Sequence, residues 1–357
     1  YINKKFKSIY RKKPYKKNFF LFGLAFGFGF YLSGLSWITN SLTFDENFKV
    51  LIPFALVLIP LFLALFVGLT TLIIGQYLKL DFCSLLIFSA GLAFSDYLRA
   101  YVFTGFPWNL WAYSTSSMNE ILQIVNLIGL HGYNLFVITI FTFPIFIFFK
   151  IGKITKIISL LVVSLIVLGI HIYGNYEINK NHEVIKNTLE KTYVKIVSPN
   201  FNLEYGLNAK EIEERFKKLI KYSDPVKEKK TLFIWPEGVF SGYSYDEILS
   251  FKDLILNNFS NKHFIIFGAN KLDSLSGSFY NSMLVINNKF EVIQIYNKRK
   301  LVPFGEFLPF EKILNSFGFK KITEGHGSFS KGKQDNNLIF DQLNILPLIC
   351  YEIIFPN

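Results

Sequence analysis

The sequence predicts a polytopic α-helical membrane domain followed by an α/β domain with a layered sheet. Of its 357 residues 51% are hydrophobic, and the mean hydropathy is +0.33. The apolar residues are concentrated in the first half of the chain. The second half alternates short, branched apolar runs with amphipathic helical segments, which is typical of an α/β fold.

Five apolar segments in the first half each reach the roughly 20 residues needed to cross a bilayer. We expect a membrane domain at 1–173, with segments at about 19–38, 50–78, 82–103, 121–149 and 154–173. Lysines gather before the first segment and around Lys150, whereas the loops 39–49 and 104–120 hold Lys49 as their one basic residue. The positive-inside rule places the lysine-rich side in the cytoplasm. Five crossings then place everything after about Gly174 outside.

Two features of the membrane domain have alternative interpretations. The aromatic stretch Gly105–Trp111 is either an anchor at the membrane interface or a lip that guides lipid or a catalytic domain resting on the membrane. Several polar residues lie at or near membrane depth, where they either satisfy one another or mark a function. They are Asp96, Arg99, Asn126, His131 and Asn134. We assign none of them a catalytic role.

Charge and cysteine content exclude several classes of protein. The net charge of +12 suggests nucleic acid, but much of it flanks apolar segments and acts as a topology signal. No nucleic-acid partner is therefore expected. The two cysteines, Cys83 and Cys350, give no disulfide framework. No metal or cofactor is expected either.

The second half begins with a polar connector at 174–191, and we expect the α/β domain at 192–357. Strands are predicted at 192–197, 232–235, 263–268, 282–286, 290–296 and 344–350, and helices at 209–223 and 246–258. The chain begins without Met and stops soon after the last of these strands. We therefore expect a fragment, cut at both ends, whose α/β domain is incomplete at its C-terminus.

Three chemically capable residues follow predicted strands: Glu237, Lys298 and Cys350. Strand ends on one edge of an α/β sheet converge on a shared crevice. There the carboxylate could move a proton, the thiol could attack a carbonyl, and the ammonium could stabilise an oxyanion. Taken singly, each has an ordinary alternative: a helix-start acid, a basic loop residue and a small core hydrophobe.

The motifs around these residues resemble the carbon–nitrogen hydrolase (nitrilase) superfamily. They are Trp235-Pro236-Glu237, the run from Tyr296 to Glu306, and Cys350-Tyr351-Glu352. Within the superfamily the chain resembles the bacterial apolipoprotein N-acyltransferases. The Leu301–Glu306 string and the five-span membrane half separate that branch from soluble amidases. Gly105-Phe106-Pro107-Trp108 and Gly129–Tyr133 resemble the membrane part of the same family.

The resemblance implies a nitrilase-like αββα layered domain with a Glu237, Lys298 and Cys350 triad, supported by Glu306, Tyr351 and Glu352. It implies transfer of an acyl chain from a phospholipid, through a cysteine thioester, to the amino group of a diacylglyceryl-cysteine in an apolipoprotein. It also implies a multi-pass protein of the bacterial inner membrane with its catalytic domain on the periplasmic side. We expect a monomer without cofactor or metal.

One departure and two rival functions accompany this interpretation. Family members usually have a Gln near the position of Ser198 and a Trp a few residues later, whereas this chain has no Trp there. Either Tyr205 substitutes for it or the lipid-binding wall is different. The loop residues Phe304, Phe307, Leu308, Phe310 and Phe317 either admit an acyl chain or belong to the core. The rivals are a membrane-tethered amidase that hydrolyses a small amide, and a transporter or receptor whose soluble domain only binds ligand.

Overall fold

The chain forms two compact units that divide between Val184 and Ile185, inside the predicted connector. The computed structural model describes residues 15–43, 46–79, 81–188, 193–202, 204, 206–240, 242–308, 328–333, 337–340 and 343–355. The N-terminal unit is called the helical unit and the C-terminal one the α/β unit. Each is described by itself.

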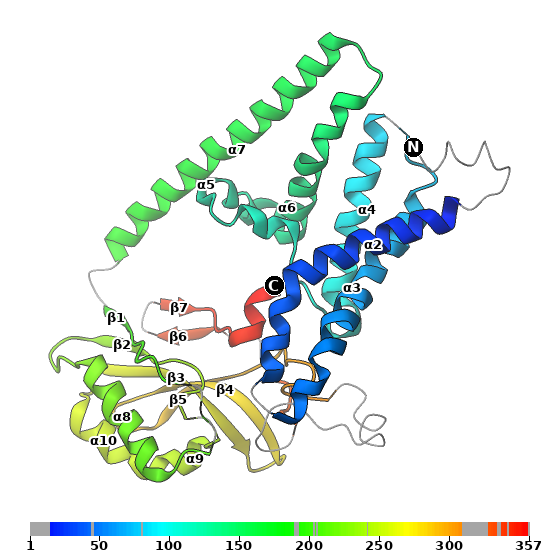
Figure 1. Cartoon of the computed structure of the whole chain (residues 1–357). Coiled ribbons are helices and arrows are strands. Elements are labelled where there is room, and N and C mark those ends of the chain that lie inside the picture. Colours follow the sequence, from blue (N-terminus) through cyan, green and yellow to red (C-terminus); the bar gives the residue numbers. More distant parts are fainter. Residues whose placement is uncertain are drawn as a thin grey trace. The chain divides into compact units, whose positions relative to one another are not determined.

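The helical unit consists of α-helices joined by short 3₁₀ segments (Figure 1). Its α-helices are α2 (Tyr15–Leu35), α3 (Ile52–Ile74), α4 (Phe82–Tyr101), α5 (Asn119–Leu122), α6 (Val125–Thr142) and α7 (Lys153–Thr188). The 3₁₀ helices are η1 (Ser36–Thr43), η2 (Glu46–Leu51), η3 (Val102–Thr104), η4 (Trp111–Thr115) and η5 (Phe143–Phe148).

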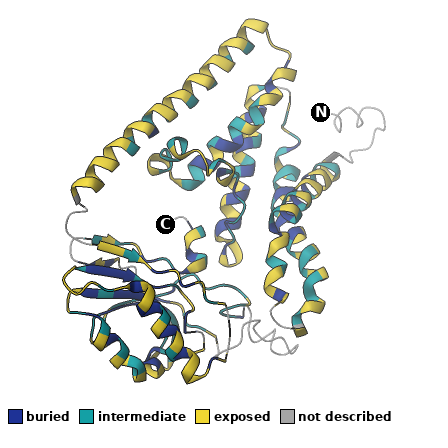
Figure 2. Cartoon of the chain, turned by 60° about the vertical axis from the view of Figure 1, so that its left-hand side comes forward, coloured by how far each residue is buried: buried dark blue, intermediate teal, exposed yellow. Residues whose placement is uncertain are grey.

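Within the described residues, five helical stretches are long and apolar enough to cross a membrane. They are Lys16–Thr43, Phe48–Ile74, Phe82–Thr104, Val125–Phe148 and Lys153–Asn187. The helical membrane domain is therefore confirmed as a fold class. Figure 2 shows α7 exposed along its length, and only 6% of its apolar window is buried. Such a surface suits contact with lipid.

Two predicted segments differ from the helices observed. The helix α7 continues through most of the connector to Thr188 because the polar stretch after Gly174 contains no proline and several good helix formers. The fourth segment, predicted as one stretch at 121–149, is interrupted. Gly129 has a left-handed φ of 69° inside α6, and after Thr142 a 3₁₀ segment begins at Phe143 with Pro144 as its second residue.

A buried ion pair on α4 is hydrogen-bonded to α6. Arg99 is only 1% exposed, and its Nη2 donates to Asp96 Oδ1 at 3.0 Å. Asn134 on α6 donates from Nδ2 to Asp96 Oδ2 at 2.9 Å. Asp96, Arg99 and Asn134 therefore bond to one another, which favours the structural interpretation for these three residues. Within the described part of the chain Arg99 Nε and both ring nitrogens of His131 are buried without a hydrogen-bond partner.

The same ion pair fixes the aromatic stretch after α4. Arg99 Nη1 donates to the backbone oxygens of Phe106 and Trp108, and the latter bond is 2.6 Å long. The backbone N–H of Ala112 donates to Asn134 Oδ1 at 3.0 Å. Helices α4 and α6 thus both hold the chain between 106 and 112.

The α/β unit is built on a five-stranded mixed sheet in the order β1-β2-β3-β4-β5. The strands are β1 (Tyr193–Ile196), β2 (Thr231–Ile234), β3 (His263–Asp273), β4 (Ser278–Ile286) and β5 (Val292–Asn297). The first three run parallel, with Thr231 opposite His263. Strand β4 is antiparallel to both β3 and β5, so β5 runs in the same direction as β3.

Helices cover one face of this sheet and a small hairpin lies on the other (Figure 1). The helices are α8 (Ala209–Ser223), α9 (Tyr245–Ile248) and α10 (Lys252–Asn258), and the hairpin is β6 (Leu338–Phe340) with β7 (Leu343–Ile345). Alternate strand residues point to the two faces. Phe233 belongs to the core under the helices, whereas the neighbouring Leu232 packs in the core that includes Phe340.

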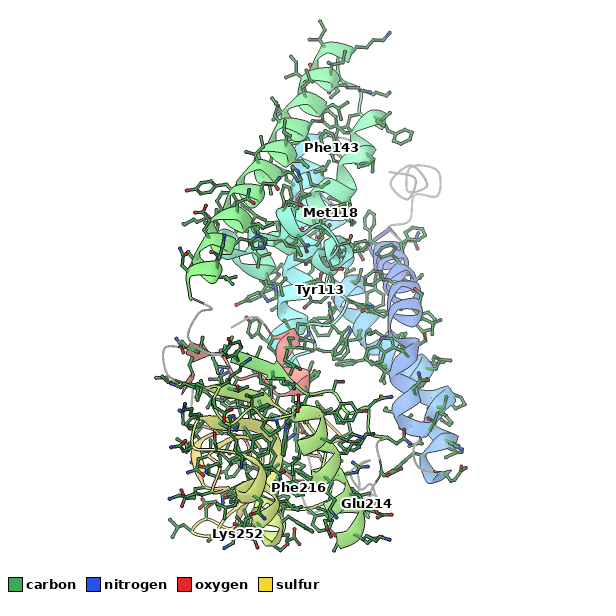
Figure 3. All side chains as sticks on the ribbon, turned by 90° about the vertical axis from the view of Figure 1, so that its left-hand side faces the viewer. Tyr113, Met118, Phe143, Glu214, Phe216 and Lys252 are labelled. Atoms are coloured by element: carbon green, nitrogen blue, oxygen red, sulfur yellow. The ribbon has the colours of Figure 1, made fainter. Side chains whose placement is uncertain are left out.

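The longest helix of this unit, α8, has the bounds that its periodicity predicts. Asn208 caps it, since its Oδ1 accepts from Glu211 N at 3.0 Å and Glu211 Oε2 accepts from Asn208 N at 2.7 Å. Phe216, labelled in Figure 3, is fully buried and stacks on Phe240 at 4.3 Å between ring centroids. Figure 2 shows the outer face of α8 exposed, whereas β2 and the first half of β3 are largely buried.

Three predicted elements of the α/β unit need correction. The third strand, predicted to stop at Gly268, continues to Asp273 because polar residues of β3 pair with β4, as Asn270 does with Asn281. The predicted helix 246–258 is split into α9 and α10 by a 3₁₀ turn, η6 (Leu249–Phe251). The predicted strand 344–350 ends as β7 at Ile345, since Pro347 has no N–H for a ladder.

Candidate active site

Two of the three predicted site residues lie at one edge of the sheet. Strands β2 and β5 run in the same direction as β3, so their carboxyl ends share an edge. Glu237 follows β2 after Trp235-Pro236, and Lys298 directly follows β5. Glu237 is exposed, whereas Lys298 is 1% exposed. The predicted convergence of these strand ends is present.

Asn281 connects the charged groups at this edge. Lys298 Nζ donates to Glu306 Oε1 at 3.0 Å, and Asn281 Nδ2 donates to the same oxygen at 2.9 Å. Asn281 Nδ2 also lies 3.2 Å from Glu237 Oε1, to which it donates. The backbone N–H of Lys298 donates to Asn281 O at 2.9 Å. A continuous chain of hydrogen bonds thus runs from Glu237 to Lys298.

Sequence reasoning missed Asn281. A polar residue in the middle of a strand gives no periodicity signal, and the predicted strand began one residue later, at Ser282. A signal was available in the pairing of β4 with β5, because Ser282 lies opposite Asn297, next to Lys298. A hairpin that ends at Lys298 brings the side of β4 near 281 to the same edge.

The loop after Lys298 presents Glu306. Its carboxylate Oε2 accepts from Val302 N at 2.9 Å, and its own N–H donates to Val302 O at 2.8 Å. Phe304, at the tip of this turn, has a left-handed φ of 64°. The turn therefore orients Glu306 toward the buried ammonium of Lys298.

Cys350 does not end a strand as predicted. It is the first residue of a 3₁₀ helix, η7 (Cys350–Ile354), and it is exposed. Its φ of 49° is left-handed, a conformation that costs a non-glycine residue about 1–3 kcal/mol. Such strain is common where a turn must present a nucleophile.

Glu352 ties the turn of Cys350 to the loop of Lys298. Its buried carboxylate accepts at Oε1 from the backbone N–H groups of Arg299 at 2.7 Å and Lys300 at 3.0 Å. The hydroxyl of Tyr296 donates to the same oxygen at 2.9 Å, and Ile349 N donates to Oε2 at 2.9 Å. One carboxylate therefore fixes two segments that are far apart in sequence.

The electrostatics of the thiol depend on the residues at the same edge. Desolvation, and after it the Glu237 carboxylate, raise the pKa of the Cys350 thiol above its ordinary value, while the Lys298 ammonium lowers that pKa. At neutral pH the thiol therefore keeps its proton. A base is needed to take that proton when the sulfur attacks.

The remaining predicted residues are Tyr351 and the aromatic and apolar loop residues. Tyr351 is half-buried and makes an edge contact with Phe355 at 5.1 Å. Of the apolar loop residues, Phe304 is exposed, Phe307 is half-buried and Leu308 is buried. Tyr205, Phe310 and Phe317 lie outside the described residues, as does the basic stretch 1–14. Among the side chains described, no three His, Cys, Asp or Glu residues form a metal site.

Gly268 of β3 leaves room for Glu237 to lie close against the sheet. A Cβ at position 268 would lie 3.2 Å from Glu237 Cα and 3.3 Å from its Cγ. A larger residue there would push the carboxylate away from Asn281. The close approach of Glu237 to the sheet therefore depends on this glycine.

Two family models match the chain, one in each unit. Residues 6–143 match the apolipoprotein N-acyltransferase N-terminal domain, and residues 200–357 match the carbon-nitrogen hydrolase family. The second match contains the whole constellation described above. The α/β unit is therefore nitrilase-like, as the sequence predicted.

Curated relatives are similar to nearly the whole chain. The apolipoprotein N-acyltransferase of Brucella melitensis is 29% identical over 345 residues, which are 94% of this chain and 64% of that protein. Those of Rickettsia prowazekii and Rickettsia typhi are 30% and 31% identical, and each match covers 94% of this chain and 66% of the relative. The chain thus spans about two thirds or slightly less of their length.

Similarity to solved structures is smaller. A crystal structure of an N-terminal amidase aligns with 30% of this chain and 28% of its own, at a TM-score of 0.22 and 22% sequence identity. This overlap is too small for a comparison of sites.

Proposed function

Because the chain belongs to the apolipoprotein N-acyltransferase family, we propose that it moves a fatty acyl chain from a phospholipid to the N-terminal amino group of a diacylglyceryl-modified apolipoprotein. The observation that carries this proposal is the group of Glu237, Lys298 and Cys350 at one sheet edge. The five helices able to cross a membrane suit a lipid donor and a lipid-anchored acceptor.

In the first half-reaction Glu237 takes the proton of the Cys350 thiol while the sulfur attacks the ester carbonyl of the donor. The ammonium of Lys298 stabilises the negative oxygen that develops on the carbonyl. The carbon–oxygen bond to the glycerol then breaks, and the departing oxygen receives the proton from Glu237. The products are a lysophospholipid and a thioester on Cys350.

The second half-reaction returns the enzyme to its resting state. The amino group of the acceptor attacks the thioester carbonyl, and Glu237 takes the proton that the nitrogen loses. The carbon–sulfur bond breaks, and Glu237 passes the proton to the sulfur. A thioester is well suited to this step because its thiolate leaves more readily than an alkoxide.

The supporting residues have separate positioning roles in this scheme. Glu306 holds the Lys298 ammonium in place at 3.0 Å. Glu352 fixes the turn of Cys350 against the loop that follows Lys298. Tyr351 directly follows the nucleophile in sequence and packs on Phe355.

The proposed location follows from the charge distribution between the apolar segments. We place the protein in the bacterial inner membrane as a monomer, with the α/β unit on the periplasmic side. A reporter fused after Gly174 in the complete protein would then be extracytoplasmic. A cytoplasmic signal from this fusion would contradict the location.

Intact-mass spectrometry tests the function. The complete protein in detergent micelles, incubated with a phosphatidylethanolamine, should gain one fatty acyl group that neutral hydroxylamine removes. The Cys350→Ala variant should gain none. Addition of a diacylglyceryl-modified lipopeptide should discharge the acyl group onto the peptide amine.

The outcomes separate the rival functions. If phospholipid leaves no adduct while a small amide is hydrolysed, the protein is an amidase of the same superfamily. If Cys350→Ala and Glu237→Ala both retain full function in cells, the α/β unit only binds a ligand. Either result would overturn the acyltransferase proposal.

A further inference from the structure

Two cationic segments lie beside the candidate nucleophile, beyond Lys298 itself. Arg299 and Lys300 directly follow Lys298 in the loop. A second segment, 328–333, carries Lys331, and the backbone N–H of Gly332 donates to Lys298 O at 2.8 Å. This bond brings Lys331 to the same sheet edge as Lys298 and Lys300.

A hydrogen bond and a cation–π contact hold Lys300 against the turn that carries Cys350. Glu352 of that turn accepts the backbone N–H of Lys300 at 3.0 Å. The Lys300 Nζ lies 4.9 Å from the ring centroid of Phe355, directly after η7. Lys300 is therefore held against the turn that carries the thiol, in a half-buried position.

The charge of these lysines is not neutralised within the described part of the chain. There, no acidic side chain forms an ion pair with Lys300 or Lys331, and the nearby Glu352 carboxylate already accepts four hydrogen bonds. Burial, followed by the positive charges of Lys331 and Arg299, lowers the pKa of Lys300, and the Glu352 carboxylate offsets this lowering only in part. An anion placed between the lysines would relieve this repulsion.

A basic loop is more often a solvated surface than a binding site. A solvated lysine extends into water, whereas Lys300 is half-buried on an aromatic ring and faces like charges. Lysine ammonium groups bind phosphate oxygens by charge-assisted hydrogen bonds, which are stronger than neutral ones. The unmet charge therefore suits a phosphate group.

We propose that Lys300 and Lys331 form a phosphate-binding subsite on the same edge as Cys350, and that the phosphodiester of the acyl donor occupies it. This inference rests on the proposed function, because it assumes that a phospholipid delivers the acyl chain to the thiol. In this arrangement the head group is bound beside the turn, and the ester that it carries reaches the sulfur.

The test compares two acyl donors in the complete protein, held in detergent micelles. One is a phosphatidylglycerol and the other is p-nitrophenyl palmitate, which has an acyl ester and no phosphate. The variant Lys300→Gln/Lys331→Gln should lower kcat/KM for the phospholipid relative to the nitrophenyl ester by at least about tenfold, since the loss of either one of the two charge-assisted hydrogen bonds would already cause a loss of that size. The control Lys333→Gln removes an exposed lysine of the same segment and should leave this ratio unaltered.

Each outcome decides one question. An equal loss with both donors, or the same loss in Lys333→Gln, would overturn the subsite. If the ratio is unaltered while inorganic phosphate inhibits nitrophenyl ester turnover in the parent and not in the double variant, the site takes free phosphate, and the lipid head group is excluded. If the parent forms no thioester with phospholipid but does with the nitrophenyl ester, the proposed function fails.

Discussion

Each unit contains a buried ion pair with an asparagine attached to it. In both, a cation pairs with a carboxylate, and the amide of the asparagine donates to that carboxylate. In the helical unit Arg99 pairs with Asp96, and the amide of Asn134 donates to that carboxylate. In the α/β unit Lys298 pairs with Glu306, and the amide of Asn281 donates to it. Both cations are 1% exposed. The pairs differ in what lies at their other end.

The helical pair ends inside the protein, while the α/β pair leads to the surface. Both oxygens of Asp96 accept hydrogen bonds from side chains, and Arg99 also donates to two backbone oxygens. The chain that starts at Lys298 continues through Asn281 to the exposed Glu237. This difference indicates that the two pairs have different roles. The pair of Arg99 and Asp96, whose hydrogen bonds are all made inside the protein, supports folding. The pair of Lys298 and Glu306, which is linked to an exposed carboxylate, supports chemistry.

Removal of Arg99 should have the largest effect. Arg99→Met leaves Asp96 as a buried charge without its cation, which costs about 3–5 kcal/mol. The complete protein should therefore unfold at a markedly lower temperature in a thermal scan in micelles. The double variant Asp96→Asn/Arg99→Met removes both charges and should recover part of this loss. An unaltered melting temperature in Arg99→Met would contradict a folding role.

Lys298→Met should have the next largest effect: it leaves Glu306 without its cation, and in the protein that still folds it should lower the rate of acylation. Removal of one group that stabilises an oxyanion costs about 10²–10³-fold in rate. The rate of acyl-adduct formation from phospholipid, followed by intact mass, should fall by that factor. A loss of less than tenfold, with the protein still folded, would remove Lys298 from the proposed chemistry.

Much of the α/β unit was predictable because local signals agree with the fold. The spacing of Ile212, Phe216 and Leu219 and the cap at Asn208 define α8 before any tertiary contact is known. Lys298 was placed correctly at a strand end because β5 alternates up to Asn297. The catalytic roles of these residues stay predictions.

Other parts depend on contacts that no local pattern contains. Asn281 matters through two carboxylates 44 and 25 residues away in sequence. The left-handed turn at Cys350 is fixed by Glu352, whose partners Tyr296 and Arg299 come from the end of another strand and the loop after it. The pair of Asp96 and Arg99, three positions apart on a helix, was visible in the sequence, but its carbonyl partners were not.

Asn281→Leu should lower activity by a smaller factor than Lys298→Met. It removes one donor from Glu306 and one from Glu237, and each such hydrogen bond contributes about 0.5–1.5 kcal/mol. We expect kcat/KM for acyl transfer to fall about tenfold. Asn281→Asp should be worse, because it adds a negative charge between two carboxylates. Full activity in Asn281→Leu would show that the bridge does not position the acid.

The smallest effect is expected in the reactivity of the thiol with pH. The Glu237 charge raises the pKa of Cys350 and the Lys298 charge lowers it. In a Cys83→Ala background, Glu237→Gln should therefore move the pH profile of iodoacetamide alkylation to lower pH, and Lys298→Met should move it to higher pH. Glu237→Gln would then alkylate faster than the parent at neutral pH while failing to transfer an acyl chain, because it has lost its base. Shifts in the same direction for both variants would mean that their charges do not act on this thiol, and that the open end of the α/β network is not where its chemistry occurs.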